Sequence, residues 1–306
     1  MDQEIELRHL RYFVAVAEEL HFGRAARRLH LSQPPLSQQI RRLEELLGYS
    51  LFVRTSRAVR LTSAGEVFLE RAQRTLRKMD EDVEAMRTVA RGEAGTLTVG
   101  FIGSAMLTAI PAMLGLYRTR FPKVHLQLHE AYSSQVLRAL KDGSLDVGFA
   151  RDGDPTDGIE KEALFSEPFV AVLPAKHPLA QRSRLLDASK LAGEPFVFYS
   201  PLAGTRAYER PMSICEAAGF RPRVVQEAPQ WLTIMHLVGA GLGVSIGPAC
   251  VARIRTPEVV CLHLRTPPRA RAARSEIDLA WRAGESRPIV EAFCRMAREE
   301  LRRRSR

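Results

Sequence analysis

Two adjacent prolines near the N-terminus fix where one helix of this chain begins. Pro34 and Pro35 lack the backbone N–H that a helix interior needs, so a helix tolerates them only in its first turn. Ser32 precedes them as a candidate N-cap residue, and Gly48 stands where the helix should end. Between these limits lies an apolar stripe at helical spacing, which consists of Leu36, Ile40, Leu43 and Leu47. The pattern predicts one amphipathic helix with a defined start and end.

The segments on either side of this helix also have regular patterns. Apolar residues at helical spacing predict two shorter helices before it, and alternation predicts two short strands after it. The ranges are 7–19 and 22–29 for the helices and 51–53 and 59–61 for the strands. A polar turn with Arg54 and Arg57 joins the two strands. Three helices followed by a basic two-stranded wing are typical of a winged helix-turn-helix.

The polar side of the proline-initiated helix is rich in amides and guanidinium groups. The residues outside its apolar stripe include Gln33, Ser37, Gln38, Arg41 and Arg42. Amides and hydroxyls bond to base edges in the major groove, and guanidinium groups bond to guanine and phosphates. Residues 21–62 contain eight arginines and only two acidic residues, which favours an anionic partner. The alternative is a small helical domain with a solvated basic face, which leaves the agreement of helix, cap, wing and charge unexplained.

A long helix with a narrow apolar seam is predicted next. Thr62 or Ser63 can cap it, and Glu66 stands where it completes a capping box with Ser63. The seam alternates by three and four between charged residues and consists of Leu69, Ala72, Leu76, Met79, Val83, Met86 and Ala90. This spacing predicts pairing with the same helix of a second copy, and packing against the chain's own domain is the alternative. Gly92 and Gly95 end the helix.

Length and composition indicate two domains with apolar cores. The 306 residues are 45% apolar and 26% charged, with a net charge of +10. The four cysteines are far apart without metal-site spacing, so we expect no metal, cofactor or disulfide framework and a reducing, cytoplasmic compartment. We expect no signal peptide. Two stretches without charges, 96–117 and 228–252, are interrupted by glycine and proline, which favours buried strand–helix pairs over membrane spans.

Strands alternate with helices in the neutral middle of the chain, which predicts an α/β fold with a mostly parallel sheet. The expected strands lie at 97–101, 124–128, 146–150, 169–173, 196–199 and 244–246, and a helix is expected from near Ser104 through Tyr117. The chain is expected to build one lobe, cross into a second and return, with a cleft between them. Ser104, Ser133 and Arg151 stand at strand ends, where such sheets bind ligands. Because hydroxyls and one arginine suit a carboxylate, our hypothesis is a small anionic metabolite.

Three runs in the first part of the chain carry a resemblance to a known family. They are RHLRYFVAVAEE, AARRLHLSQPPLSQQIRRLEELLG and LFVRTSRAVRLTSAGE. The chain resembles the LysR-type transcriptional regulators, and within them the muconate-responsive regulators of aromatic catabolism. The resemblance implies an N-terminal winged helix-turn-helix, a long dimerising linker helix and a two-lobed, periplasmic-binding-protein-like effector domain. The implied bounds are 1–62, 63–91 and 92–306, with lobe one at 92–166 and 271–306 and lobe two at 167–270.

The resemblance also implies roles for individual residues. The DNA contacts would be Gln33, Pro34 and Ser37 on bases, Arg41 and Arg42 on or near the backbone, and Arg54 and Arg57 on phosphate or in the minor groove. Many relatives carry arginine where this chain has Gln38. The effector contacts would be Ser104, Ser133, Arg151 and, in one turn, Ser200, Pro201 and Gly204. The resemblance further implies an activator that binds promoter DNA as a homodimer or homotetramer and contacts RNA polymerase.

Two segments resemble enzyme motifs but lack the residues that the motifs require. The segment 243–247 fits GxSxG, but Glu258 and His263 lie too close to Ser245 in sequence to come from separate loops of a hydrolase. The segment 239–243 misses the last glycine of a dinucleotide-binding GxGxxG. The remaining alternative function is a solute-binding or solute-processing protein whose N-terminal domain is incidental. Steep loss of DNA affinity with salt would distinguish a DNA binder from it.

Overall fold

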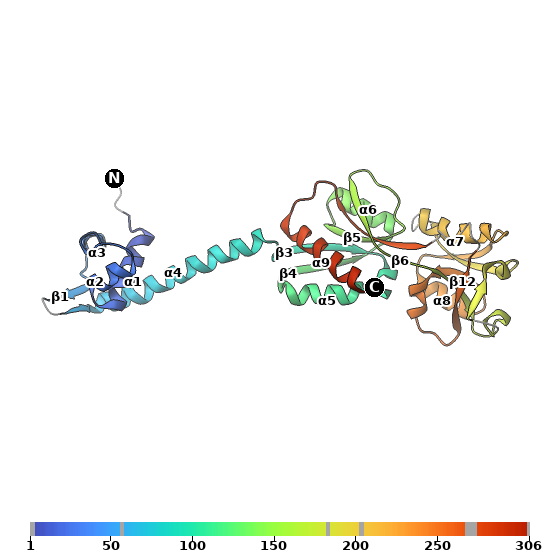
Figure 1. The fold of residues 1–306 in the computed structure, drawn as a ribbon, viewed down its shortest axis with the longest axis horizontal. Coiled ribbons are helices and arrows are strands. Elements are labelled where there is room, and N and C mark those ends of the chain that lie inside the picture. Colours follow the sequence, from blue (N-terminus) through green and yellow to red (C-terminus); the bar gives the residue numbers. More distant parts are fainter. Residues whose placement is uncertain (1–3, 56–57, 182–183, 202–204, 267–273, 305–306) are drawn as a thin grey trace. The chain divides into compact units, whose positions relative to one another are not determined.

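The computed structural model describes residues 4–55, 58–181, 184–201, 205–266 and 274–304. The chain forms two compact units, Met1–Thr88 and Val89–Arg306 (Figure 1). No helix among the described residues combines the length and the apolar character that a bilayer crossing requires.

The first unit contains the predicted winged helix-turn-helix. Its elements are α1 (Leu7–Glu19), α2 (Phe22–Arg28), α3 (Gln33–Leu47), β1 (Phe52–Arg54), β2 (Val59–Leu61) and α4 (Ser63–Ala90). Leu36, Ile40 and Leu43 of the apolar stripe of α3 are fully buried in one cluster with Phe13 and Phe52, and Leu47 is partly buried at its edge. Gly48 ends α3 with a φ of +74°, which favours glycine. Ser32 is the N-cap residue as predicted, but its hydroxyl makes no cap hydrogen bond.

The start of α4 differs in detail from the prediction. The helix begins at Ser63, so the N-cap residue is Thr62, whose hydroxyl accepts a hydrogen bond from the backbone N–H of Gly65 at 2.9 Å. The predicted capping box between Ser63 and Glu66 is therefore wrong, because Glu66 lies one residue too far along for Thr62.

The apolar seam of α4 has two parts. Its N-terminal part packs on the first unit, where Ala72 is buried and the rings of Phe68 and Phe13 are 5.0 Å apart. Farther along, the side chains of Met79 and Met86 are 41% and 65% exposed. Packing against the chain's own domain thus accounts for the start of the seam, and the rest of it remains open to solvent.

The second unit begins with a lobe built on one five-stranded sheet, here called lobe one. Its elements are β3 (Ala94–Phe101), η1 (Gly103–Leu107), α5 (Ile110–Arg120), β4 (Lys123–Glu130), α6 (Ser133–Asp142), β5 (Val147–Arg151), β6 (Ile159–Glu167), β13 (Ser275–Arg282) and α9 (Pro288–Arg304). The strand order is β4-β3-β5-β13-β6. Helices α5 and α9 cover one face of the sheet, and α6 covers the other.

The second lobe, here called lobe two, holds the residues between β6 and β13. Its elements are β7 (Phe169–Pro174), η2 (Pro178–Gln181), β8 (Leu185–Asp187), η3 (Ala188–Leu191), β9 (Pro195–Tyr199), α7 (Thr205–Ala217), β10 (Arg223–Ala228), α8 (Trp231–Gly239), β11 (Ser245–Pro248), η5 (Ala249–Arg253) and β12 (Val259–Arg265). Four strands pair in the order β11-β7-β12-β8, and β9 pairs with β10. Helices α7 and α8 pack on separate apolar clusters.

Two predictions for this unit need correction. Strands β4, β3 and β5 are parallel as expected, but β13 is antiparallel to both of its neighbours and β7 is antiparallel to β11 and β12. The five-stranded and four-stranded sheets are therefore mixed and not mostly parallel, whereas β9 and β10 pair in parallel. The helix expected from Ser104 through Tyr117 is also interrupted, because Thr108 is extended and Pro111 starts a new helix.

Candidate functional site

The first candidate site is the polar face of α3. Gln33, Pro34, Gln38 and Arg41 are exposed, and Ser37 is half-buried. Among the described residues, none of the side chains of Gln33, Ser37, Gln38 and Arg41 has a hydrogen-bond or ion-pair partner. Gln33, Ser37 and Arg41 line a hollow of about 870 Å³ between α3, the start of α2 and the wing. These side chains are free to bind an external ligand without breaking an internal bond.

A neighbouring amide shows the opposite arrangement. Gln39 turns toward α1, where its Oε1 lies 3.0 Å from Nε2 of the buried His9. Nδ1 of His9 accepts a hydrogen bond from the backbone N–H of Glu6, so Nε2 carries the proton and donates to Gln39. The pair Gln38 and Gln39 thus divides into one free amide and one that holds two helices together.

The wing arginine Arg54 is bound within the domain. Its guanidinium forms an ion pair of 2.5 Å with Glu44 and lies 5.0 Å from the centroid of the Phe22 ring. The other oxygen of Glu44 accepts the backbone N–H groups of Leu51 and Phe52. Glu44 therefore joins α3 to β1, with Arg54 as part of the connection. Arg57 lies outside the described residues.

Arg42 is only partly free. Its guanidinium lies 3.6 Å from the Glu45 carboxylate three residues along α3. Both side chains are well exposed, so this pair contributes little to stability and an external anion can replace it. Arg41 is accordingly the more available cation on this helix.

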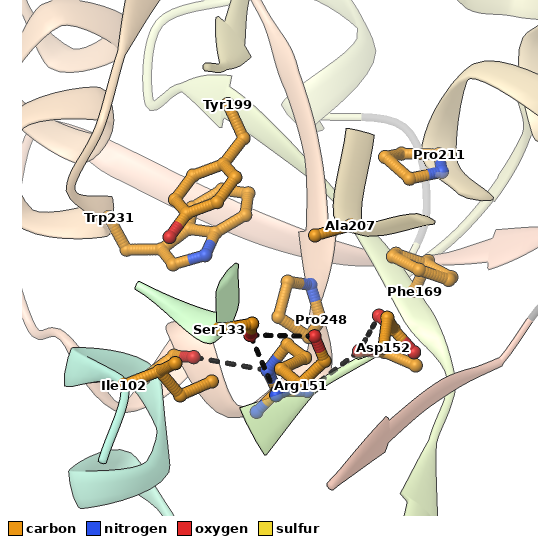
Figure 2. Close-up of a pocket in the computed structure, with 12 residues that line it drawn as sticks. Ile102, Ser133, Arg151, Asp152, Phe169, Tyr199, Ala207, Pro211, Trp231 and Pro248 are labelled. Carbon is orange, nitrogen blue, oxygen red and sulfur yellow. Dashed lines mark hydrogen bonds between the residues drawn. The ribbon is translucent and has the colours of Figure 1, made fainter. Parts of the chain in front are cut away.

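The second candidate site is a small cavity between the two lobes of the second unit (Figure 2). Its empty space is about 370 Å³ when the opening to solvent is included, and the centres of water-sized molecules have about 20 Å³ of it. Its lining residues are Ile102, Ser104, Ser133, Arg151, Asp152, Phe169, Tyr199, Ala207, Pro211, Trp231, Pro248 and Ser275. The structure thus brings together three of the predicted effector contacts: Ser104 from η1, Ser133 from the start of α6 and Arg151 from the end of β5.

Arg151 is almost completely buried, and most of its donors are already used. Nε donates to the Ser104 hydroxyl at 3.0 Å, and Nη1 donates to Glu167 at 2.7 Å and to Ser275 at 2.8 Å. Nη2 has one partner among the described residues, the weakly accepting sulfur of Cys250 at 3.4 Å. Because a guanidinium has five N–H bonds, Nη2 keeps one N–H for a ligand and can exchange the other.

The two cavity serines have different tasks. The Ser133 hydroxyl accepts the backbone N–H of Arg151 at 3.0 Å and donates to the carbonyl oxygen of Arg151 at 2.9 Å, so it fixes the end of β5. The Ser104 hydroxyl accepts from the Arg151 side chain, and its own proton is available for a ligand. Ser104 is thus the better placed of the two to donate to an anion.

The predicted turn contributes less than expected. Ser200 is buried and donates its backbone N–H to Ala228, Pro201 is exposed, and neither lines the cavity in the part of the chain that the structure describes. Their neighbour Tyr199 does line it. Gly204 lies outside the described residues.

An aromatic wall of the cavity was missed by sequence reasoning. The rings of Tyr199 and Trp231 stack with centroids 5.6 Å apart and an angle of 8° between their planes (Figure 2). Trp231 also requires the glycine at 247, because a Cβ there would lie 2.5 Å from its ring. Burial raises the pKa of Tyr199 to about 12, so its hydroxyl stays protonated. The sequence offered one signal for this wall: Tyr199 stands at the end of a strand, and Trp231 stands at the start of a helix.

The carboxylate Glu167 was also missed, and it connects the lobes. One oxygen binds Arg151 in lobe one, and the other accepts the backbone N–H of Cys250 at 2.6 Å in lobe two. Burial raises the pKa of the Cys250 thiol to about 12, so the sulfur beside Arg151 is a neutral thiol. Nothing in the sequence placed Glu167 at the site, because it lies 16 residues from Arg151 at the crossing into lobe two.

A second ion pair connects the lobes at the residue after Arg151. Asp152 is buried on the cavity wall, and Arg210 of α7 binds it at 3.1 Å. Arg210 also binds Glu276 at 3.1 Å and the carbonyl oxygen of Arg274. The cavity region therefore contains two arginines, each paired with a carboxylate of the protein.

The structure also explains why the GxSxG segment is not a nucleophile elbow. Ser245 is fully buried in β11, paired with β7, and its hydroxyl has no partner among the described residues. A nucleophile elbow needs its serine exposed on a sharp turn between a strand and a helix. Within the described ranges, no group of three or more histidine, cysteine or acidic side chains could hold a metal ion.

Comparison with known proteins matches both units. Residues 7–66 match the model "Bacterial regulatory helix-turn-helix protein, lysR family", and residues 90–302 match "LysR substrate binding domain". The chain is 43% identical to the uncharacterized HTH-type transcriptional regulator YnfL of Escherichia coli K12, covering 94% of this chain and 96% of that protein. It is 37% identical to the Hca operon transcriptional activator HcaR of the same organism, covering 97% and 98%.

A solved structure is similar over nearly the whole length. It is full-length CbnR in complex with its target DNA, with 28% sequence identity and a TM-score of 0.80, covering 97% of this chain and 100% of that one. The relatives named here are transcriptional regulators, and the family predicted from the sequence is confirmed.

Proposed function

The chain belongs to the LysR family of bacterial transcriptional regulators, and from this premise we propose that α3 reads promoter DNA while the cavity senses a small carboxylate. For DNA reading, the support is the free polar face of α3. Gln33 and Ser37 supply an amide and a hydroxyl for base edges, beside Pro34, and Arg41 and Arg42 supply cations for the backbone. Gln38 is equally free to reach a base.

The effector proposal is carried by Arg151. Its buried guanidinium keeps an N–H for a ligand at the cavity wall, next to the donor hydroxyl of Ser104. The stacked rings of Tyr199 and Trp231 offer an apolar surface that suits a flat or unsaturated body. A carboxylate of the aromatic-catabolism type fits both features.

For assembly, we infer a homodimer or homotetramer in which the open part of the α4 seam pairs with a second copy. Met79 and Met86 on that part are exposed in the single chain, and heptad spacing favours a helix partner. The regulator would act in the cytoplasm as an activator that contacts RNA polymerase. The effector changes DNA binding only to the extent that it binds one arrangement of the lobes or subunits better than another.

Thermal unfolding with a panel of mono- and dicarboxylates tests the effector proposal. We expect at least one aromatic or unsaturated carboxylate to raise the melting temperature. The shift should disappear in Arg151→Ala and persist in Arg118→Ala, a control at an exposed arginine on α5. An equal ligand-induced shift in Arg151→Ala would remove Arg151 from the site.

A further inference from the structure

The carboxylate at the cavity wall next to Arg151 has a geometry that links ligand binding to a proton. Asp152 is 4% exposed and adopts a left-handed backbone with a φ of +48°, fixed by a hydrogen bond from its N–H to the carbonyl oxygen of Glu276. One carboxylate oxygen accepts the backbone N–H of Glu276 and binds Arg210. The other oxygen has a single partner among the described residues, the Ser275 hydroxyl at 2.8 Å.

Ser275 connects this carboxylate to the proposed ligand site. Its hydroxyl oxygen accepts from Nη1 of Arg151 at 2.8 Å, and its proton points to Asp152. Ser275 also lines the cavity. Arg151 thus forms a direct ion pair with Glu167, and the Ser275 hydroxyl links it to the second carboxylate, Asp152. A carboxylate that binds at Nη2 brings a third negative charge to one guanidinium.

We propose that a carboxylate binding at Arg151 is accompanied by uptake of one proton by Asp152, and that the Ser275 hydroxyl then turns from Asp152 toward the ligand. The proton comes from solvent and joins the oxygen that faces Ser275. Protonated Asp152 donates to the Ser275 oxygen, which frees the hydroxyl proton of Ser275 for the ligand carboxylate. The proton thus offsets the negative charge that the ligand brings, and the cavity gains one donor. This inference rests on the proposed function.

Several groups around Asp152 bear on this step. Burial raises the pKa of Asp152, and the bonds from Glu276, Arg210 and Ser275 and the charge of Arg151 only partly oppose the shift. Further charged groups nearby include Arg138 and Lys141 of α6, which line a second hollow together with Asp152. Three ion pairs also lie nearby: Asp154 with Arg206, Lys161 with Asp278, and Glu276 with Arg210. A ligand that takes up the charge of Arg151 removes one of the opposing interactions, so it raises the pKa of Asp152 further.

Calorimetric titration of the full-length protein with benzoate tests the proposal. The titrations run between about pH 5.5 and about pH 8.5, in two buffers that differ in ionisation enthalpy. Benzoate stays ionised in this range, so proton uptake belongs to the protein. We expect the wild type to take up protons on binding and its affinity to fall by up to about tenfold per pH unit as the pH rises.

Two isosteric variants assign the proton. Asp152→Asn keeps the left-handed backbone accessible, because asparagine tolerates it, and should bind benzoate with no proton uptake and no pH dependence. Glu167→Gln should retain the uptake. Uptake by Asp152→Asn equal to that of the wild type, or its loss in Glu167→Gln, would overturn the assignment. Should Asp152→Asn fail to fold, the infrared band of a protonated carboxyl, which should appear when benzoate binds the wild type, is the alternative measurement.

The outcomes separate this inference from the proposed function. Benzoate binding that depends on Arg151 but not on pH would contradict proton coupling and leave the carboxylate site standing. A wild type that binds neither benzoate nor any other carboxylate at any pH would overturn both.

Discussion

The polar side chains of α3 and those of the effector cavity differ in what they already bind. On α3, Gln33, Gln38 and Arg41 have no partner among the described residues, whereas Arg151 in the cavity spends most of its donors on the protein itself. A surface of the first kind can bind at once and gains every contact. A site of the second kind offers few free donors and must exchange other contacts to hold a carboxylate through both oxygens, so full binding there is tied to a rearrangement, which is what a sensor requires.

The largest expected effect of this difference is on stability. Arg151→Met should lower the stability of the second unit by about 3–5 kcal/mol, because it leaves the largely inaccessible Glu167 carboxylate, 14% exposed, without its cation. The measurement is the urea midpoint of unfolding followed by circular dichroism. The double variant Arg151→Met/Glu167→Gln should recover part of the loss. A single variant as stable as the wild type would show that the ion pair is not formed.

On α3 the expected effect is on specificity and not on stability. Gln33→Ala should reduce the preference for the natural promoter over other DNA by about 1–3 kcal/mol, since a lost amide contact removes base discrimination. Competition binding with mutated promoter fragments measures this preference. The free energy of unfolding of Gln33→Ala should stay within about 0.5 kcal/mol of the wild-type value.

The matched control for this variant is Gln39→Ala. It removes the amide that His9 binds and should lower stability while preserving base preference in the folded fraction. Equal loss of specificity in both variants would mean that the unpartnered amide of Gln33 and the His9-bound amide of Gln39 do not differ in role.

The smallest expected effect separates the two kinds of arginine in the first unit. Arg41→Met should weaken binding to all DNA sequences by about threefold at intermediate salt and reduce the salt slope by about one unit, the loss of one phosphate contact. Arg54→Met should instead lower stability by about 1–2 kcal/mol, because Arg54 binds Glu44 and Phe22. An unchanged salt slope in Arg41→Met would exclude a phosphate contact there.

Local patterns predicted the first unit well because its helices are set by neighbouring residues. The prolines, the apolar stripe and Gly48 determine α3, and the structure places its bounds at Gln33 and Leu47. The seam of α4 was visible for the same reason. The pairing of Arg54 with Glu44 was not, because ten residues and a turn separate them.

The cavity could be predicted only in part. Arg151, Ser104 and Ser133 were found because each stands at a strand end or helix start. Their partners come from distant segments: Ser275 lies 124 residues from Arg151 and starts β13, a strand that sequence reasoning did not find. Long-range antiparallel pairing leaves no local periodic signal that identifies the partner strand. The internal hydrogen bonds of Arg151 therefore could not be predicted from the sequence.

Fluorescence anisotropy with the wild-type protein tests the central claim most directly. The natural promoter fragment and a scrambled duplex of the same length are compared at physiological salt. We predict tighter binding to the promoter by at least about 10³-fold, altered when a carboxylate that stabilises the protein is added. Equal affinity for both duplexes, unchanged by any carboxylate, would contradict the account.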